Sequence, residues 1–158
     1  MIAALTADAS SVSTYLYGRR MYEAMAGWET DPAVAAQSPE SANFAETWKQ
    51  ATKVVFSTSL TDVWTERTRL EPALTREAVA RAKAESEGDL TIEGPTLAKI
   101  ALELDLVDVV EVVYCPIIAG GGTRVFPDGL RQKLSLTRER RFGNGMVQVT
   151  YERDNTGA

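Results

Sequence analysis

The sequence lacks histidine and has a single cysteine, Cys115, among its 158 residues. Without histidine, the chain cannot form Ser-His or Cys-His nucleophile pairs or the usual general base near neutral pH, and most zinc sites are excluded. One cysteine rules out a disulfide framework and is typical of a reducing cytoplasm, which is where we expect the protein. Because no histidine is available to activate it, Cys115 is expected to be a small buried hydrophobic residue.

Long apolar runs and an excess of positive charge are also missing. No run reaches the length of a transmembrane helix, and the opening "MIAALTADASS" lacks the basic start of a signal peptide, so we expect no membrane contact. Lys and Arg number 17 against 22 Asp and Glu, which argues against nucleic acid as a partner. The length fits a single domain over residues 1–158, which can bury a hydrophobic core without disulfide bonds or a structural metal.

Three carboxylates, Asp105, Asp108 and Glu111, cluster near the start of an apolar stretch. A metal site would need them to converge. In a strand, positions 108 and 111 face opposite sides, so the pattern favours solvated charges and no metal site.

Strand and helix patterns alternate along the middle of the chain and end in a hairpin. Strands are predicted at 15–18, 53–59, around 63–64, 89–94 and 106–118, and helices at 19–28, 41–50, 76–87 and 95–105. Residues 29–41 read as a polar loop, and Trp28, Trp48 and Trp64 as core or core-edge residues. Asn144-Gly145 between alternating stretches predicts a C-terminal hairpin. This order of strands and helices indicates an α/β domain with a mixed sheet covered by helices on both faces.

In "YLYGRRMYE", two arginines stand at a helix start, where the macrodipole favours negative charge. Gly18 lets the backbone approach a ligand, and the first N–H groups of the helix have no intrahelical partner. Phosphate suits such N–H groups together with guanidinium forks. The alternative is that Arg19 and Arg20 are solvated or pair with Glu23 and other nearby acids.

Three further stretches follow predicted strands, at the sheet edge where ligands bind in open α/β folds. Ser57–Ser59 could donate to a second phosphate or simply form a turn. Gly94-Pro95-Thr96 opens a helix and could bind an anion or only cap that helix. The glycines at 120–122 could admit a ligand or another chain close to the backbone, or form a tight crossover connection.

Taken in order, these stretches resemble the dihydrofolate reductase-like superfamily, and within it the bacterial branch related to the C-terminal reductase domain of riboflavin biosynthesis (the RibD C-terminal type). The likeness is carried by "YLYGRRMYEAMAGWE", "TKVVFSTSL", "DLTIEGPTLA", "LVDVVEVVYCPIIAGGGTRVFP" and "RRFGNGMVQVTYE". It implies a three-layer α/β/α fold with a mixed, mainly parallel sheet that ends in an antiparallel hairpin.

The resemblance also implies NADPH as cofactor and assigns residues to it. The phosphates of NADPH would face Gly18, Arg19, Arg20, Met21 and Tyr22. Its 2′-phosphate would face Ser57, Thr58 and Ser59, and its pyrophosphate would face Gly94, Pro95, Thr96 and Leu97. Its nicotinamide end would lie near Gly120 and Gly121. The implied reaction is hydride transfer to a pterin- or pyrimidine-like substrate. No residue of this chain inherits the role of proton donor.

The sequence departs from the family in two places. Glu93 stands where relatives have the first of two glycines, and its charge should weaken pyrophosphate binding. Relatives begin with a strand resembling Ser-Leu-Asp-Gly, a substrate-side segment and a helix, whereas only residues 1–14, "MIAALTADASSVST", precede "YLYGRR" here. A missing central strand would leave unpaired backbone groups, for which pairing with a second copy is one remedy, so we expect a homodimer. The alternative function is a non-catalytic nicotinamide-nucleotide-binding or structural dimer, and a binding module for another phosphorylated ligand is a third reading.

Overall fold

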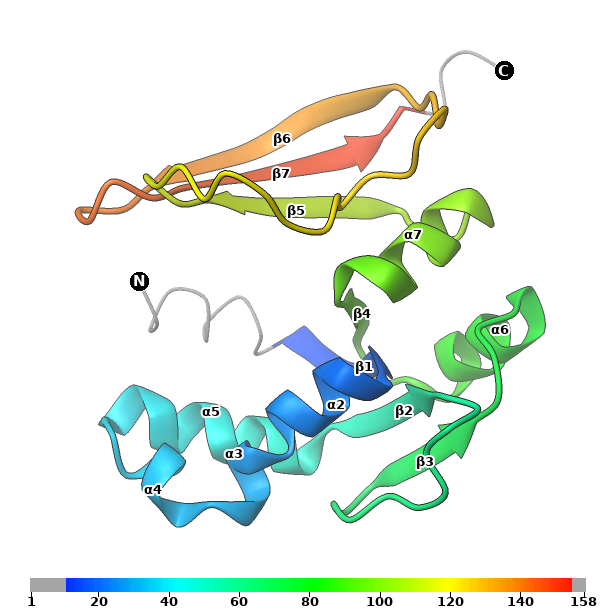
Figure 1. Ribbon diagram of the computed structural model, residues 1–158, viewed down its shortest axis with the longest axis vertical. Helices are drawn as coiled ribbons and strands as arrows, with labels where there is room; N and C mark the ends of the chain where they lie inside the picture. Colours follow the sequence, from blue (N-terminus) through cyan, green and yellow to red (C-terminus); the bar gives the residue numbers. More distant parts are fainter. Residues whose placement is uncertain (1–10, 155–158) are drawn as a thin grey trace.

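The computed structural model describes residues 11–154, which form two β-sheets (Figure 1). The first sheet is parallel, with the order β3-β2-β1-β4, and comprises β1 (Val12–Gly18), β2 (Thr52–Phe56), β3 (Thr68–Glu71) and β4 (Asp89–Glu93). The second is antiparallel, with the order β5-β7-β6, and comprises β5 (Val109–Tyr114), β6 (Leu134–Arg141) and β7 (Val147–Arg153). The predicted α/β class, with parallel strands first and an antiparallel hairpin last, is confirmed.

The helices begin where the sequence supplies capping residues. They are α2 (Arg19–Met25), α3 (Gly27–Thr30), α4 (Pro32–Ala35), α5 (Pro39–Gln50), α6 (Arg76–Glu85) and α7 (Pro95–Glu103). The side chains of Asp31, Ser38 and Thr75 each accept a hydrogen bond from a backbone N–H in the first turn of α4, α5 and α6 respectively. In contrast, α2 and α7 start at glycines that provide no side-chain cap.

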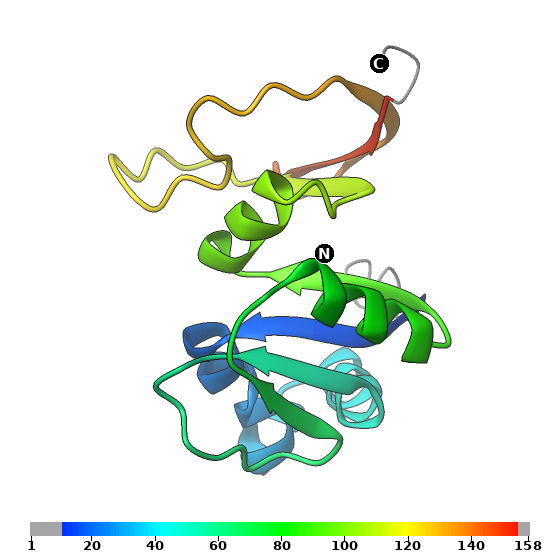
Figure 2. The ribbon, with the colours of Figure 1, turned by 90° about the vertical axis from the view of Figure 1, so that its right-hand side faces the viewer.

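Alternation along β1 separates two hydrophobic cores, one on each face of the first sheet (Figure 2). Leu16 and Val54 pack on one face with α6 and α7. Tyr15, Tyr17 and Trp48 pack on the other face, among residues of α2 and α5. The first sheet therefore has the expected helix, sheet and helix layers.

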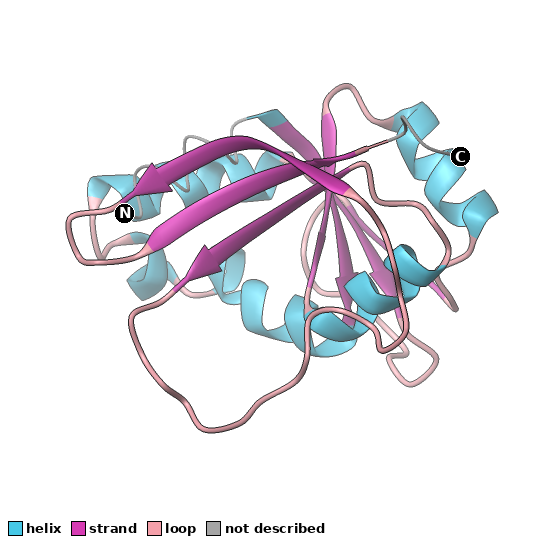
Figure 3. Ribbon diagram, turned by 90° about the horizontal axis from the view of Figure 1, so that it is seen from above, coloured by secondary structure: helices cyan, strands magenta, loops and turns pink. Residues whose placement is uncertain are grey.

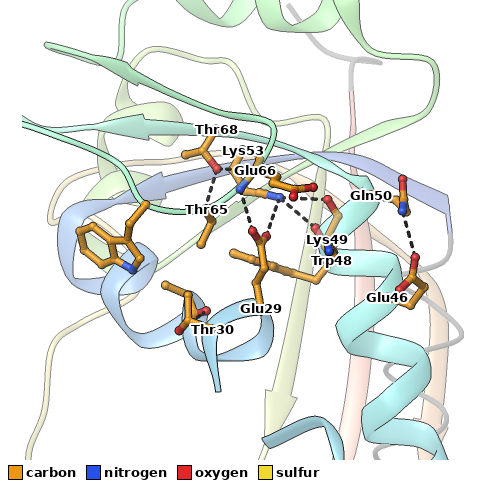
Figure 4. Close-up of polar contacts among 12 residues, drawn as sticks. Glu29, Thr30, Glu46, Trp48, Lys49, Gln50, Lys53, Thr65, Glu66 and Thr68 are labelled. Carbon is orange, nitrogen blue, oxygen red and sulfur yellow. Dashed lines mark hydrogen bonds and ion pairs between the residues drawn. The ribbon is translucent and has the colours of Figure 1, made fainter. Parts of the chain in front are cut away.

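Lys53 is a fully buried cation beneath the second of these cores (Figure 4). Its Nζ donates to the carbonyls of Trp48 (3.2 Å) and Lys49 (3.3 Å) at the C-terminus of α5, lies 4.4 Å from the Trp48 ring centroid, and is 3.8 Å from the Glu29 carboxylate. Glu29 in turn accepts the N–H of Glu66 at 2.7 Å. Burial lowers the Lys53 pKa to about 8, against an opposing effect of Glu29. One amine therefore connects α5, α3 and the loop before β3.

The mixed sheet expected from the sequence is divided in two. Strand β4 ends one sheet and β5 ends the other, and no ladder joins them in the described part of the chain. Seen from above, the strands of the second sheet run at an angle to those of the first (Figure 3). Leu104, Leu106 and Val107 pack against the core beside α6 and α7, and Lys83 forms an ion pair with Asp108 at 2.8 Å.

Five local predictions are wrong, each for a physical reason. Residues 63–64 form no strand and Trp64 is 51% exposed, because the N–H groups of Trp64 and Thr65 bond to a tyrosine hydroxyl and not to a neighbouring strand. Cys115 is exposed, because β5 ends at Tyr114 and the predicted strand 106–118 shortens to Val109–Tyr114. The loop 29–41 contains the short helix α4, which Asp31 caps.

The remaining expectations concern the N-terminus and membrane contact. The expectations for residues 1–10 lie outside the described residues. Within residues 11–154, no helix is both long and apolar enough to cross a bilayer.

Candidate functional site

Three of the four predicted stretches meet at one edge of the first sheet, which we call the rim. Gly18 pairs in register with Phe56, so Ser57 follows directly beside it, and Tyr17 pairs with Glu93, so Gly94 also lies next to Gly18. The three strands are parallel, and their carboxyl ends therefore open on the same side of the molecule (Figure 2). The predicted juxtaposition of these segments is thus present.

Gly18 leaves open space at the start of α2. Its backbone is extended (φ −81°, ψ 163°), which any residue can adopt, and a Cβ built there would meet no atom within 4 Å among the described residues. Neither backbone strain nor packing therefore requires glycine here. No acidic residue stands in the first turn of α2, and no side chain caps its N–H groups. This arrangement leaves donors and room for an anion.

The backbone conformation at position 94 requires glycine. Its φ is +95°, a conformation that L side chains rarely adopt, and a Cβ there would lie 3.6 Å from the Cβ of Met21. It precedes Pro95, which has no N–H, so the uncapped donors of α7 are the N–H groups of Thr96 and Leu97. The Leu97 side chain is buried in the core, and that of Met21 packs at the edge of the other core. Only the backbone of Leu97 can therefore serve a ligand.

The loop after β2 is tied to Arg19. Ser57 Oγ accepts the N–H groups of Ser59 (3.2 Å) and Leu60 (3.0 Å), so Ser57 is a turn former as well as a rim residue. Thr58 and Ser59 are exposed. Arg19 Nη1 donates to Ser59 Oγ at 3.4 Å, and its Nε lies 3.7 Å from Glu23. Arg19 therefore pairs with Glu23, as the alternative reading of the sequence predicts, and its guanidinium also reaches the second predicted phosphate segment.

Tyr22 holds these two segments together. Its fully buried ring lies 4.8 Å from that of Trp64, and its hydroxyl accepts the N–H groups of Trp64 (2.9 Å) and Thr65 (3.2 Å). The same hydroxyl exchanges a hydrogen bond with Thr65 Oγ1 at 3.1 Å. One side chain of α2 thereby fixes the far end of the loop that starts at Ser57.

Glu93 places a carboxyl group in a poorly hydrated part of the rim. Burial raises its pKa to about 6. Burial and then the charge of Glu93 raise the pKa of Tyr15 to about 12 and that of Tyr17 further. Tyr17 Oη accepts the Trp48 Nε1 hydrogen at 3.0 Å, whereas the buried Tyr15 hydroxyl has no hydrogen-bond partner among the described residues. The rim thus holds a carboxyl that can change its protonation near neutral pH.

Replacing Glu93 should make the protein more stable at neutral pH. The folded pKa of about 6 lies above the ordinary 4.5, so its protonated form favours folding, and that contribution is lost as the pH rises from 4.5 through 6. We expect Glu93→Gln to raise the free energy of unfolding at pH 7 by up to about 2 kcal/mol. It should also flatten the fall in stability across this pH window, measured by urea denaturation. Glu87→Gln, at an exposed position before β4, is the matched control and should change neither quantity. An unchanged pH profile in Glu93→Gln would show that Glu93 is hydrated.

The glycine loop lies apart from the rim. Gly120, Gly121 and Gly122 are exposed, and a Cβ at any of them would meet no described atom within 4 Å. Figure 2 shows the segment 115–133 on the same side as the carboxyl ends of β1 and β2 but beyond α7. The segment that contains the glycine loop therefore lies beyond α7 from the rim.

The acidic cluster is engaged in separate contacts. Asp105 pairs with Arg153 and Asp108 with Lys83, both at 2.8 Å, and Glu111 accepts from Thr150 Oγ1 at 3.4 Å. No group of three potential metal ligands converges within residues 11–154. A shallow open hollow lies at the opposite end of β1, between Val12 and Glu46, away from the rim.

Sequence reasoning missed the contributions of Tyr22 and Glu93. The family likeness implies Tyr22 only as a residue that faces the phosphates, and nothing local signals its partner 43 positions away, at Thr65. The sequence presents Glu93 only as a repulsive charge, because its burial depends on strands distant in sequence.

Comparison with known proteins supplies further evidence. The family model described as the RibD C-terminal domain matches residues 3–148. A search of curated proteins found no match. The chain is similar in structure to a putative riboflavin biosynthesis protein from Shewanella sp. PV-4, with a TM-score of 0.71, 20% identity, and coverage of 96% of this chain and 78% of that one. It is also similar to a pyrimidine reductase-like protein from Corynebacterium diphtheriae, with a TM-score of 0.68, 15% identity, and coverage of 96% and 79%. At these identities the two structures support the fold alone.

Proposed function

Because the chain belongs to the RibD C-terminal domain family, whose model spans residues 3–148, we propose that it is an NADPH-dependent reductase. The reaction would be hydride transfer to a C=N or C=O group of a pterin- or pyrimidine-like substrate. The observation that carries the proposal is the rim, where two uncapped helix starts, two arginines and a hydroxyl-bearing loop converge. Anionic oxygens are the ligands that such a set of donors favours.

The residues present fit a dinucleotide. The space above Gly18 and the N–H groups at the start of α2 would receive one phosphate, with Arg19 and Arg20 beside it. The N–H groups of Thr96 and Leu97 would receive the neighbouring phosphate. Thr58 and Ser59, together with Arg19, would hold a phosphate on the ribose, which favours NADPH over NADH. NADPH, when bound, would supply the hydride; the chain would orient it and exclude water.

Glu93 is compatible with this ligand. Phosphate oxygens close to its carboxyl would favour the protonated form, and burial already raises the pKa to about 6. At neutral pH, binding would therefore be accompanied by proton uptake at Glu93.

A titration of the full chain with NADPH and NADH tests the proposal. We expect NADPH to bind about tenfold or more tightly than NADH and to raise the melting temperature. Loss of reduced-nicotinamide absorbance with dihydrofolate and with aminopyrimidine substrates then measures catalysis. Failure of both nucleotides to bind at about 1 mM would reject both the reductase and the binding-only alternative.

The alternative is a non-catalytic nicotinamide-nucleotide-binding protein. Two observations favour it: the glycine loop lies away from the rim, and β4 has no partner on its outer edge in the described residues. Binding of NADPH without oxidation by any substrate of these two classes would support this alternative. Binding of another phosphorylated ligand alone would support the third reading.

A further inference from the structure

The order of the strands gives a bound dinucleotide a direction along the rim. Under the proposed function, the loop after β2 holds the ribose 2′-phosphate, and the start of α7, which follows β4, holds one phosphate of the pyrophosphate. Strand β1 lies between β2 and β4, so the adenosine half would lie over β2 and β1. The nicotinamide half must then continue at β4 and beyond it, on the side where Figure 2 shows the second sheet.

Glu93 is the last residue of β4 and lies where this second half begins. It directly precedes Gly94, the residue at which the chain turns into α7. Leu90 and Ile92 pack against the core beside α6 and α7, so alternation along the strand directs Glu93 to the opposite face, which holds Tyr17. The register agrees, because Glu93 and Tyr17 are paired positions of β4 and β1. The Glu93 carboxyl is therefore beside the turn assigned to the pyrophosphate.

Two polar groups in this part of the rim lack a partner. Within residues 11–154, no hydrogen bond or ion pair engages the Glu93 carboxyl, and burial alone raises its pKa. The Tyr15 hydroxyl is likewise unpaired among the described residues, although its side chain is only 1% exposed, and the charge of Glu93 acts on it. Buried polar groups are seldom left unpaired in folded proteins. These two groups therefore indicate a site that a polar ligand completes.

We propose that the Glu93 carboxyl forms hydrogen bonds with the hydroxyls of the unphosphorylated ribose of NADPH, an assignment that rests on the proposed function. This ribose follows the pyrophosphate directly along the ligand, just as Glu93 adjoins the turn that would hold the pyrophosphate. Its two adjacent hydroxyls match the two oxygens of a carboxyl group. A hydroxyl can donate or accept, so the contact forms whether the carboxyl is ionised or protonated. The residue that departs from the two-glycine pattern thereby gains a ligand of its own.

Two uncharged substitutions separate this contact from the repulsion between Glu93 and phosphate. Glu93→Gln keeps a carbonyl oxygen that accepts a hydroxyl hydrogen, whereas Glu93→Leu has a similar volume and no polar group. Calorimetric titration of the full chain should show NADPH binding to Glu93→Gln about tenfold more tightly than to Glu93→Leu. Glu87→Gln and Glu87→Leu, at an exposed position before β4, are the matched control pair and should bind NADPH equally. Far-ultraviolet circular dichroism checks that each variant is folded.

Two shorter ligands locate the contact on the dinucleotide. 2′-Phospho-ADP-ribose contains the second ribose but no nicotinamide and should show the same preference for Glu93→Gln, whereas 2′-phospho-ADP ends at the pyrophosphate and should bind both variants within about twofold. Equal affinity of NADPH for the two variants would overturn the assignment of Glu93 and leave the reductase proposal standing. A preference seen with NADPH but not with 2′-phospho-ADP-ribose would also overturn it, because the contact would then be to the nicotinamide. A wild type that binds none of the three ligands would reject the proposed function and this assignment together.

Discussion

Lys53→Met is expected to destabilise the protein by about 1 to 2 kcal/mol at pH 7, measured by urea denaturation, because the lost hydrogen bonds and ion pair outweigh the removed cost of burying the charge. Methionine preserves the volume of the side chain but removes the hydrogen bonds to the carbonyls of Trp48 and Lys49. It also leaves the Glu29 carboxylate, only 12% exposed, without its cation. Breaking a buried pair by removing one partner is costly because the remaining charge is uncompensated.

The double variant Lys53→Met/Glu29→Gln is the control. Removing both charges should recover part of the loss, because no buried carboxylate then remains ionised. The two exposed-pair substitutions Lys99→Met and Glu103→Gln on α7 should each change stability by less than about 0.5 kcal/mol. A single variant as stable as the wild type would show that the amine contributes nothing net.

Alkaline pH separates the charge of Lys53 from its packing. The folded pKa of about 8 lies below the ordinary 10.5, so the contribution of the neutral amine is fully present above 10.5 and is lost as the pH falls through 8. Wild-type stability should therefore gain about 3 kcal/mol from this group between pH 8 and 10.5. Lys53→Met should lack that gain.

Replacing Arg19 and Arg20 together by alanine is expected to weaken NADPH binding about 100-fold, measured by calorimetric titration. Each guanidinium would contribute charge-assisted hydrogen bonds to phosphate, reduced by the exposure of the Arg19 side chain at 43%. NADH should lose less, because Arg19 also reaches Ser59 in the loop assigned to the 2′-phosphate.

The matched control removes two positive charges elsewhere. Arg131→Ala/Lys133→Ala lies in exposed chain before β6, beyond α7, and should leave NADPH affinity within about twofold at physiological salt. An equal loss for NADPH and NADH in the arginine variant would assign both arginines to the pyrophosphate. An unchanged affinity would remove them from the site altogether.

Elements with strong local signals were predictable from the sequence. The Asn144-Gly145 hairpin forms because Gly145 adopts a φ of +85° and the N–H of Phe142 bonds to the carbonyl of Met146. Helices α5, α6 and α7 begin within two residues of their predicted starts, at Pro39, Arg76 and Pro95. These features depend on a few neighbouring residues and are therefore readable in a single sequence.

Features set by distant contacts were not predictable. Trp64 lies outside the core because the backbone N–H of its loop donates to the Tyr22 hydroxyl. Cys115 is exposed because β5 ends one residue before it. At the rim, the strand, turn and helix pattern correctly brought Gly18, Ser57 and Gly94 together, since parallel strands end at one edge. It could not place Gly120, whose position depends on how the second sheet sits against α7.

The triple hydrogen bonding of Tyr22 has a consequence for ligand affinity. The chain from Ser57 to Thr65 is anchored at both ends before any ligand arrives, by the Ser57 turn and by the tyrosine hydroxyl. Ordering that segment is then a cost of folding and not of association. A molecule that bridges Arg19 and Ser59 meets a preorganised surface. Little conformational entropy is lost when it binds, so its affinity reflects the contacts it makes.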